Sequence, residues 1–257
     1  MLINNIKLKK MKKFLLLFCA TALVLTSCSS DDSSDSETPD AGASDGVFLK
    51  KTITTNSEGG KYTTNYTYDG NKLVSVIDNS GDSNEYYTYT GDLITKLEYK
   101  LSDGTVEQLN TYAYTDGKLT TFVRIDPDMD WGNKEVYTHN ADGTITVKTY
   151  IGDSKTQTQL NSTGTVKFSN GEVIEITSDV QDDHSYTYDT KNNPLRNVLG
   201  WNKINFIDGE ANDVLHNMLT DKVGSEVWYS YTYTYNADGY PTKSVESVEE
   251  ETVELFY

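Results

Sequence analysis

The chain has few of the residues that build disulfides, metal centres or nucleophilic active sites. Of its 257 residues, two are cysteine and three are histidine. Cys19 falls within a predicted signal peptide, so Cys28 alone would remain and no intramolecular disulfide could form. The sequence has no His-x-x-x-His, Glu-x-x-His or paired-cysteine spacing, which argues against a transition-metal site. It also has no Gly-x-Ser-x-Gly elbow and no phosphate-binding loop, so we expect no enzyme and no cofactor.

Basic residues are also scarce. The chain has 22 lysines and arginines against 39 acids, a formal net charge of −17. A surface of this sign repels nucleic acid and anionic lipid headgroups, so we expect no nucleic-acid partner. An acidic surface could attract cations or basic partners, although solubility is the commoner reason for it.

Long apolar runs are missing apart from one near the N-terminus. Residues 14–25 form an apolar run of twelve that follows five lysines, and translation could start at Met1 or Met11. This run is too short to span a bilayer and is typical of a signal-peptide core, which predicts a signal peptide over residues 1–27. It ends in Leu25-Thr26-Ser27-Cys28, which resembles the bacterial lipobox and implies that Cys28 is lipidated. The alternative is an ordinary secretory signal with an incidental cysteine.

Residues 28–46 lack large apolar side chains and are rich in serine and acids, so we predict a disordered tether. Its start, Ser29-Ser30-Asp31-Asp32, resembles the acidic export signal of surface lipoproteins of the Bacteroidetes. That resemblance implies a protein anchored to the outer membrane through Cys28 and exposed at the cell surface. A plain spacer on a lipoprotein that faces the periplasm is the alternative.

Residues 47–257 repeat one pattern. A Tyr-x-Tyr alternation precedes a turn, and an alternation of apolar residues follows it. Turn glycines recur every 21 to 28 residues, at Gly70, Gly91, Gly117, Gly143 and Gly171. Alternating tyrosines share one face of a strand, and Asp-Gly and Asn-Gly pairs favour tight hairpin turns. The pattern predicts a single all-β domain: an antiparallel meander of about fourteen strands built from tandem hairpins. We expect a twisted or curled sheet with one face lined by Tyr, Leu, Ile and Val.

The repeats resemble a known family where Tyr-Asp is followed by glycine. Tyr68-Asp69-Gly70, His139-Asn140-Ala141-Asp142-Gly143 and Tyr235-Asn236-Ala237-Asp238-Gly239 resemble the YD repeats of Rhs and teneurin-type proteins. Residues 50–257 are similar to YD-repeat-like surface lipoproteins of flavobacteria. This likeness rests on Asn193-Pro194-Leu195 and on the closing repeat. The resemblance implies a long β meander and no particular activity. The chain lacks the usual arginine after the repeat glycine and is too short to form a shell around a cargo.

Residues 191–225 depart from the repeat. Pro194 cannot sit in a central strand, and residues 211–219 carry an apolar stripe with helical spacing, which predicts a short helical or irregular insertion. We expect it to plug one end or face of the sheet. An insertion that contacts a ligand is the alternative, because binding residues concentrate on irregular segments.

A few residues are candidates for contact with a ligand. Trp131, Trp201 and Trp228 offer flat rings that could stack on a sugar, although a tryptophan more often covers a strand edge. Asp126, Asp128 and Asp130 alternate as in a calcium loop, but the glycine and glutamate that such a loop needs are missing. His139 stands where other repeats have a tyrosine, so we interpret it as a residue of the tyrosine face.

Three functions are compatible with the sequence. The first is a non-enzymatic binding or interaction module at the cell surface, for a glycan or a protein, since exposed Tyr and Trp suit sugars. The second is a structural component of an outer-membrane assembly. The third is a cell-surface glycoside hydrolase, which would need a concave cleft with two facing carboxylates.

Overall fold

A computed structural model describes residues 46–80 and 83–257, and the predicted signal peptide, Cys28 and most of the tether lie outside them. The described part of the chain contains sixteen strands and two short 3-10 helices, joined by turns and loops. The strands are β1 (Lys51–Thr55), β2 (Lys61–Asp69), β3 (Lys72–Asp78), β4 (Asn84–Thr90), β5 (Leu93–Lys100), β6 (Val106–Thr115), β7 (Lys118–Asp126), β8 (Trp131–His139), β9 (Ile145–Gly152), β10 (Gln157–Ser169), β11 (Glu172–Ser178), β12 (His184–Tyr188), β13 (Met218–Val223), β14 (Glu226–Tyr235), β15 (Pro241–Glu246) and β16 (Thr252–Phe256). The 3-10 helices are η1 (Pro127–Met129) and η2 (Trp201–Lys203), and a search of the described residues finds no helix that could cross a membrane.

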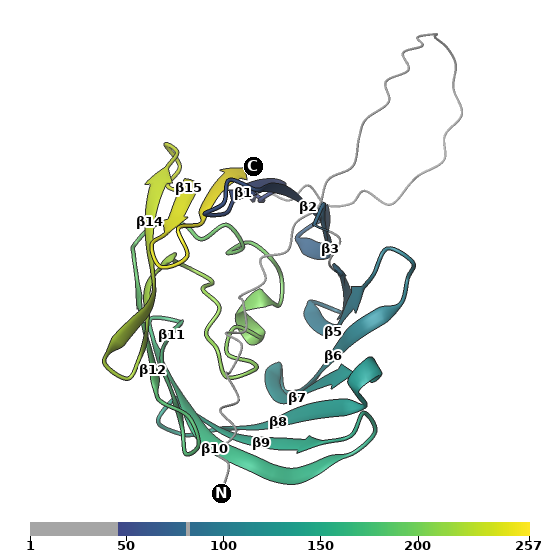
Figure 1. Cartoon of the computed structure of the whole chain (residues 1–257). Coiled ribbons are helices and arrows are strands. Elements are labelled where there is room, and N and C mark those ends of the chain that lie inside the picture. Colours follow the sequence, from purple (N-terminus) through teal and green to yellow (C-terminus); the bar gives the residue numbers. More distant parts are fainter. Residues whose placement is uncertain (1–45, 81–82) are drawn as a thin grey trace, which may run out of the picture.

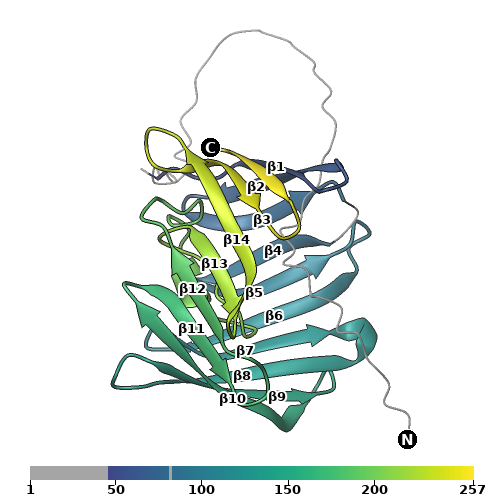
Figure 2. The same ribbon diagram turned by 60° about the vertical axis from the view of Figure 1, so that its left-hand side comes forward.

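The strands close into a barrel. Each strand pairs antiparallel with its neighbours in sequence, and β1 pairs with β16 through five residue pairs, from Lys51 with Phe256 to Thr55 with Thr252. Figure 1 shows the resulting ring of strands, and Figure 2 shows their tilt. The prediction of about fourteen strands in a twisted or curled sheet was therefore wrong. Closure removes both sheet edges, which otherwise expose unpaired backbone groups.

The predicted hairpin turns are confirmed. Asp116 and Gly117 both have positive φ, of 51° and 73°, and Asn170 and Gly171 follow the same pattern with 52° and 86°. Positive φ at both central residues is the conformation that matches the twist of a hairpin. Several hairpins also shift register just before the turn, for example between Ala113 and Tyr114. A bulge of this kind bends the strand and helps a sheet to curl.

The tyrosine face forms the inside of the barrel. Tyr87, Tyr112, Tyr137 and Tyr186 are buried in one cluster with Leu73, Ile94, Leu119, Phe122, Val166 and Val173. The residues between the tyrosines, such as Thr67 and Thr88, are exposed on the outside. The predicted assignment of one face to Tyr, Leu, Ile and Val is thus confirmed.

The second tyrosine of several repeats ties two strands together at the turn. Tyr114 donates its hydroxyl hydrogen to the carbonyl oxygen of Ile94 at 2.7 Å, and Tyr188 bonds to Val173 in the same way at 2.7 Å. His139 Nε2 lies 2.8 Å from the carbonyl oxygen of Leu119, the equivalent place. The interpretation of His139 as a residue of the tyrosine face is therefore confirmed.

We predict that Tyr114→Phe lowers the free energy of unfolding by about 1 kcal/mol, because it removes this hydrogen bond and keeps the ring. Chemical denaturation measures the change. Tyr150→Phe is the matched control, since Tyr150 lies on the outer face of β9, where Lys134 covers its ring at 5.1 Å. Equal destabilisation by the two substitutions would contradict the assigned role.

Residues 189–217, between β12 and β13, enter the barrel and are called the plug here (Figure 1). Val198, Ile204, Phe206 and Ala211 of the plug belong to the buried core cluster. The predicted plug is confirmed, but the helix at residues 211–219 is not, because Met218 already begins β13. The apolar side chains that mimic a helical stripe are the end of the plug followed by the start of a strand.

The plug seals one end of the barrel. This end, called the turn end, carries the short turns 69–72, 90–93, 115–118 and 169–172. Leu199 N donates to the carbonyl oxygen of Asn71 at 2.9 Å, and Asn192 N donates to Gly239 at 2.9 Å. Gly200 is required here: its φ is 75°, and a Cβ would lie 2.9 Å from the carbonyl oxygen of Asp92.

Candidate functional site

The barrel interior holds a cavity of about 870 Å³, whose lining runs from Leu49 and Pro241 near the turn end to the loops at the opposite end. Ser83, Met129, Glu249 and Glu251 line it, and all four come from loops at the opposite end, called here the loop end. Its floor is formed by the plug, from which Leu195, Ile207 and Ala211 line it. The mouth of the cavity therefore lies at the loop end.

Tyrosine rings form much of the cavity wall. Tyr66, Tyr99, Tyr229, Tyr231 and Tyr233 line it. Along β14, the rings of Tyr229 and Tyr231 are stacked with centroids 6.4 Å apart, and those of Tyr231 and Tyr233 repeat this spacing. Rings in this arrangement present apolar faces together with polar hydroxyl edges. The wall suits an organic ligand with both apolar and hydrogen-bonding surface.

The same cavity is strongly acidic. Nine carboxylate side chains and a single arginine, Arg124, line it. From the wall and loops come Glu107, Asp126, Asp128, Glu246, Glu249 and Glu251, and from the plug Asp208, Glu210 and Asp213. Arg124 is already paired, with Asp126 at 3.1 Å and with Asp208 at 3.0 Å. A concave wall of one charge sign concentrates the electric field inside it.

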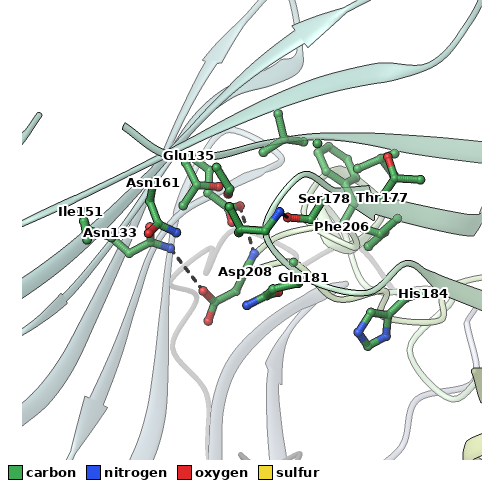
Figure 3. Close-up of a pocket in the computed structure, with 18 of the residues that line it drawn as sticks. Asn133, Glu135, Ile151, Asn161, Thr177, Ser178, Gln181, His184, Phe206 and Asp208 are labelled. Carbon is green, nitrogen blue, oxygen red and sulfur yellow. Dashed lines mark hydrogen bonds between the residues drawn. The ribbon is translucent and has the colours of Figure 1, made fainter. Parts of the chain in front are cut away.

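A smaller chamber of about 200 Å³ lies beside the tip of the plug. Asn133, Glu135, Phe206 and Asp208 line it (Figure 3). The tip is fixed because Asp208 N donates to Glu135 Oε2 at 3.0 Å, and Asn133 Nδ2 donates to Asp208 Oδ1 at 3.4 Å. Asp208 lines both the chamber and the larger cavity, so the tip separates the two spaces.

Two glutamates face the barrel interior, and each lies two positions before a buried tyrosine in the sequence. Glu85 accepts a hydrogen bond from Tyr87, and Glu135 accepts one from Tyr137. Burial raises the pKa of each carboxyl group to about 7, and in Glu135 the nearby Asp208 adds to the effect. Burial also raises the pKa of Tyr87 and Tyr137, so both hydroxyls remain neutral donors.

We predict that Glu135→Gln becomes progressively more stabilising as pH rises from 5 to 8. The folded protein keeps a proton on Glu135 up to pH about 7, whereas the unfolded chain releases it near the ordinary value of 4.5. Stability from this group therefore falls through that window, by an amount on the order of 2 kcal/mol, and a neutral amide avoids the loss. Thermal unfolding at several pH values measures the difference between variant and wild type.

Glu254→Gln serves as the control for this experiment, since Glu254 is exposed on the outer face of β16. Its stability difference from wild type should stay nearly constant over the same pH range. A constant difference for Glu135→Gln as well would contradict the raised pKa.

Two carboxylates, the buried Glu172 and the partly exposed Asp189, also hold the ends of the plug. Glu172 Oε1 accepts hydrogen bonds from Leu215 N at 2.8 Å and His216 N at 2.7 Å. Asp189 Oδ1 accepts from Asn217 N at 3.1 Å, and Asp189 Oδ2 accepts from Asn217 Nδ2 at 3.0 Å. Carboxylates here act as structural acceptors for backbone donors that would otherwise be buried without partners.

The three tryptophans predicted as ligand contacts do not come together. Trp131 lines the small chamber, and the Arg124 guanidinium lies 5.6 Å from its ring centroid. Trp201 packs inside the barrel against Tyr87, with centroids 6.2 Å apart. Trp228 is 39% exposed and contacts His184 edge-on at 5.7 Å. Trp131 alone among them lines a described cavity.

The three alternating aspartates also point to different partners. Asp126 faces the interior and pairs with Arg124, while Asp130 Oδ1 accepts a hydrogen bond from Ser154 N at 3.2 Å. Asp128 lies at the mouth of the cavity. Within residues 46–80 and 83–257 no group of three or more His, Cys, Asp or Glu side chains could hold a metal ion. Cys28, the predicted lipidation site, lies outside the described residues.

Sequence reasoning missed Glu85, Glu135, Arg124 and Asp208. The repeated Glu-x-Tyr at residues 85–87 and 135–137 was a usable signal, because a residue two before an inward tyrosine must also face inward. The contact between Arg124 and Asp208 spans 84 residues of chain and follows no repeat.

No protein-family model and no curated protein matches the chain. Solved structures do resemble it, and two porin-like proteins of Bacteroides are among them. One is a porin-like protein from Bacteroides uniformis, with 14% identity, a TM-score of 0.49, and coverage of 81% of this chain and 97% of that one. The other is a porin-like protein from Bacteroides vulgatus, with 12% identity, a TM-score of 0.52, and coverage of 82% and 99%. At this identity the second likeness concerns the fold alone.

Proposed function

We propose that this protein is a non-enzymatic binding protein, anchored to the outer membrane by a lipid on Cys28, that takes its ligand into the barrel through the loop end. The observation that carries the proposal is the cavity of about 870 Å³ with five tyrosines on its wall. Ligand pockets commonly measure about 300–1,000 Å³ and combine aromatic walls with a few polar groups. A short glycan of the kind expected at a cell surface would match this wall, because sugar rings have apolar faces and hydrogen-bonding edges.

The charged side chains on the outer wall support the proposal that the barrel is surrounded by water and joined to the membrane through its tether. On β5, Glu98 forms ion pairs with Lys96 at 2.8 Å and Lys100 at 3.3 Å. Between β10 and β11, Lys167 and Glu175 are paired at 2.8 Å. Barrels that span membranes instead carry an apolar outer band, in which a lysine costs about 2–4 kcal/mol at the bilayer midplane. The porin-like neighbours therefore supply a likeness of fold, and we do not extend it to a pore.

A Cys28→Ser variant tests the anchor. In cells that express it, we expect the wild-type chain in the outer-membrane fraction and the variant in the soluble fraction. Protease added to intact cells should cut the wild-type chain if it is exposed at the surface. A variant that stays with the membrane would contradict the lipid anchor.

A glycan array tests the ligand. The full chain, held in lipid nanodiscs, should bind a restricted set of short glycans. Tyr231→Ala, which removes a ring from the cavity wall, should weaken that binding, while Tyr150→Ala on the outer face should not. An array without any signal would count against the glycan, and equal effects of the two substitutions would count against the cavity.

A further inference from the structure

We infer that the smaller chamber is a subsite for one neutral sugar ring at the end of the glycan. This inference rests on the proposed function and deepens it, because it gives the terminal sugar a place of its own beside the cavity. The chamber volume of about 200 Å³ lies below the range of about 300–1,000 Å³ that is common for ligand pockets. The chamber therefore admits a single ring, whereas the cavity of about 870 Å³ admits several.

The chamber combines an aromatic ring with polar side chains that are available to a ligand. Trp131 lines it, and the flat apolar face of an indole suits the apolar face of a sugar. The side chains of Thr149, Asn161 and Gln181 also line it, and they form no hydrogen bond with any described residue (Figure 3). An amide offers a donor and an acceptor side by side, which matches two neighbouring hydroxyl groups of a sugar ring.

Two further groups of the lining are held in place by their neighbours. His184 Nδ1 lies 3.1 Å from Oδ1 of Asp221, which is 2% exposed, so Nε2 is the ring nitrogen left for a ligand. Glu135 accepts hydrogen bonds from Tyr137 and from Asp208 N, and both go to Oε2, which leaves Oε1 for a ligand. Side chains that are fixed in this way lose little conformational freedom when a ligand binds.

The charges around the chamber favour a neutral ring. Asp208 is paired with Arg124 at 3.0 Å and accepts a hydrogen bond from Asn133 at 3.4 Å. Burial raises the pKa of Glu135 to about 7, so this carboxyl group keeps its proton in mildly acidic solution. Asp182 is the third carboxylate of the lining and is exposed to water. The lining has no lysine or arginine among the described residues, so an acidic sugar would gain no ion pair with either.

The plug tip connects this subsite with the proposed cavity. Asp208 lines both spaces, and Phe206 and Gly209 beside it line the chamber. The exposed residues Gln181 and Asp182 lie on the loop between β11 and β12, at the same loop end as the mouth of the cavity. A glycan whose last ring lies in the chamber can therefore cross the plug tip and continue along the tyrosine wall.

The first test follows the fluorescence of Trp131. Methyl glycosides of glucose, galactose, mannose and N-acetylglucosamine are added to the full chain in nanodiscs. We expect at least one of them to change the emission at millimolar concentration, and we expect Trp131→Phe to abolish that change. Cyclohexanol, a ring with a single hydroxyl, should bind at least about tenfold more weakly, because it forms fewer hydrogen bonds.

Variants of the chamber provide the second test. Asn161→Ala and Gln181→Ala should each weaken the binding of the methyl glycoside about threefold to tenfold, the usual effect of one lost hydrogen bond. Both amides are exposed and bond to no described residue, so the variants should fold normally. Asn202→Ala is the matched control, since Asn202 is exposed on η2 and lines neither space. Equal effects of the three substitutions would contradict the subsite.

The outcomes separate this inference from the proposed function. Emission that no glycoside changes, or that cyclohexanol changes as readily, would overturn the inference. A glycan-array signal that depends on Tyr231 but not on Asn161 and Gln181 would also overturn it and leave the proposed function in place. A silent array together with unchanged emission would overturn both.

Discussion

Phe206→Ala should lower the free energy of unfolding by about 3–5 kcal/mol, the usual cost of emptying a buried phenylalanine site. Phe206 is 5% exposed and packs edge-on against Tyr137 at 5.2 Å and Phe168 at 5.7 Å. Together with Val198, Ile204 and Ala211, it joins the plug to the barrel core. For a chain of this size the loss corresponds to a fall in Tm of about 10 °C.

Denaturant titration of Phe206→Ala beside Phe256→Ala measures this effect. Phe256 is 39% exposed on the outer face of β16, so its removal creates no cavity in the core. We expect the control to lose about 1 kcal/mol or less. A Phe206 variant as stable as the control would show that the plug does not pack inside the barrel.

Asp189→Ala should cost about 3 kcal/mol, because it removes the acceptor of four hydrogen bonds at once, two of them from the buried Asn217. Asp189 accepts hydrogen bonds from Lys191 N at 2.8 Å and from both Asn217 N and Nδ2, and Tyr235 donates its hydroxyl hydrogen to it. Asn217 is 1% exposed, so water cannot replace the lost partner. Both ends of the plug would loosen together.

The same residue adds a pH dependence of the opposite sign to that of Glu135. Burial opposes ionisation of Asp189, but the hydrogen bonds from Tyr235, Lys191 and Asn217 prevail and lower its pKa below 3.8. Its contribution to stability is therefore present above that value and is lost as pH falls through the lowered pKa. Unfolding curves of wild type and Asp189→Ala should converge at low pH, and a gap that persists there would contradict this role. Glu254→Ala, on the outer face, is the control and should change stability little at any pH.

The local structure of the barrel was predictable from the sequence because it repeats. The spacing of Tyr-x-Tyr set the inward face, and the Asp-Gly pairs set the turns. Even His139 could be placed, since it occupies a tyrosine position in the repeat and makes the corresponding contact with Leu119.

Closure could not be predicted in the same way. The pairing of β1 with β16 joins residues about two hundred positions apart, and nothing in either strand marks the other as its partner. Strand number was hidden as well, because β13 begins at Met218 inside a segment with helical spacing. An open sheet and a closed barrel share the same hairpins and differ only in the accumulated tilt and stagger of the strands.

The site was the least predictable part. Its carboxylates lie on repeats, loops and the plug, and they meet only because the barrel is closed. Glu135 and Asp208 come together because the backbone N of Asp208, at the plug tip, donates to the side-chain Oε2 of Glu135 on β8. Many acids in the chain made coincidental pairs certain, so sequence spacing alone could not select these two.

The central claim is that the barrel interior is an accessible cavity with its mouth at the loop end, and thiol labelling tests it most directly. The predicted mature chain has Cys28 as its single cysteine. Because acylation blocks the thiol of Cys28, we expect little background labelling of the wild-type chain. Ser244→Cys places a thiol on the cavity wall, Thr232→Cys places one outside on β14, and Val166→Cys places one in the closed core. We predict that a small methanethiosulfonate labels the first two and that a large poly(ethylene glycol) maleimide labels only Thr232→Cys. A Ser244→Cys variant that resists the small reagent, or accepts the large one as readily as Thr232→Cys does, would contradict the account.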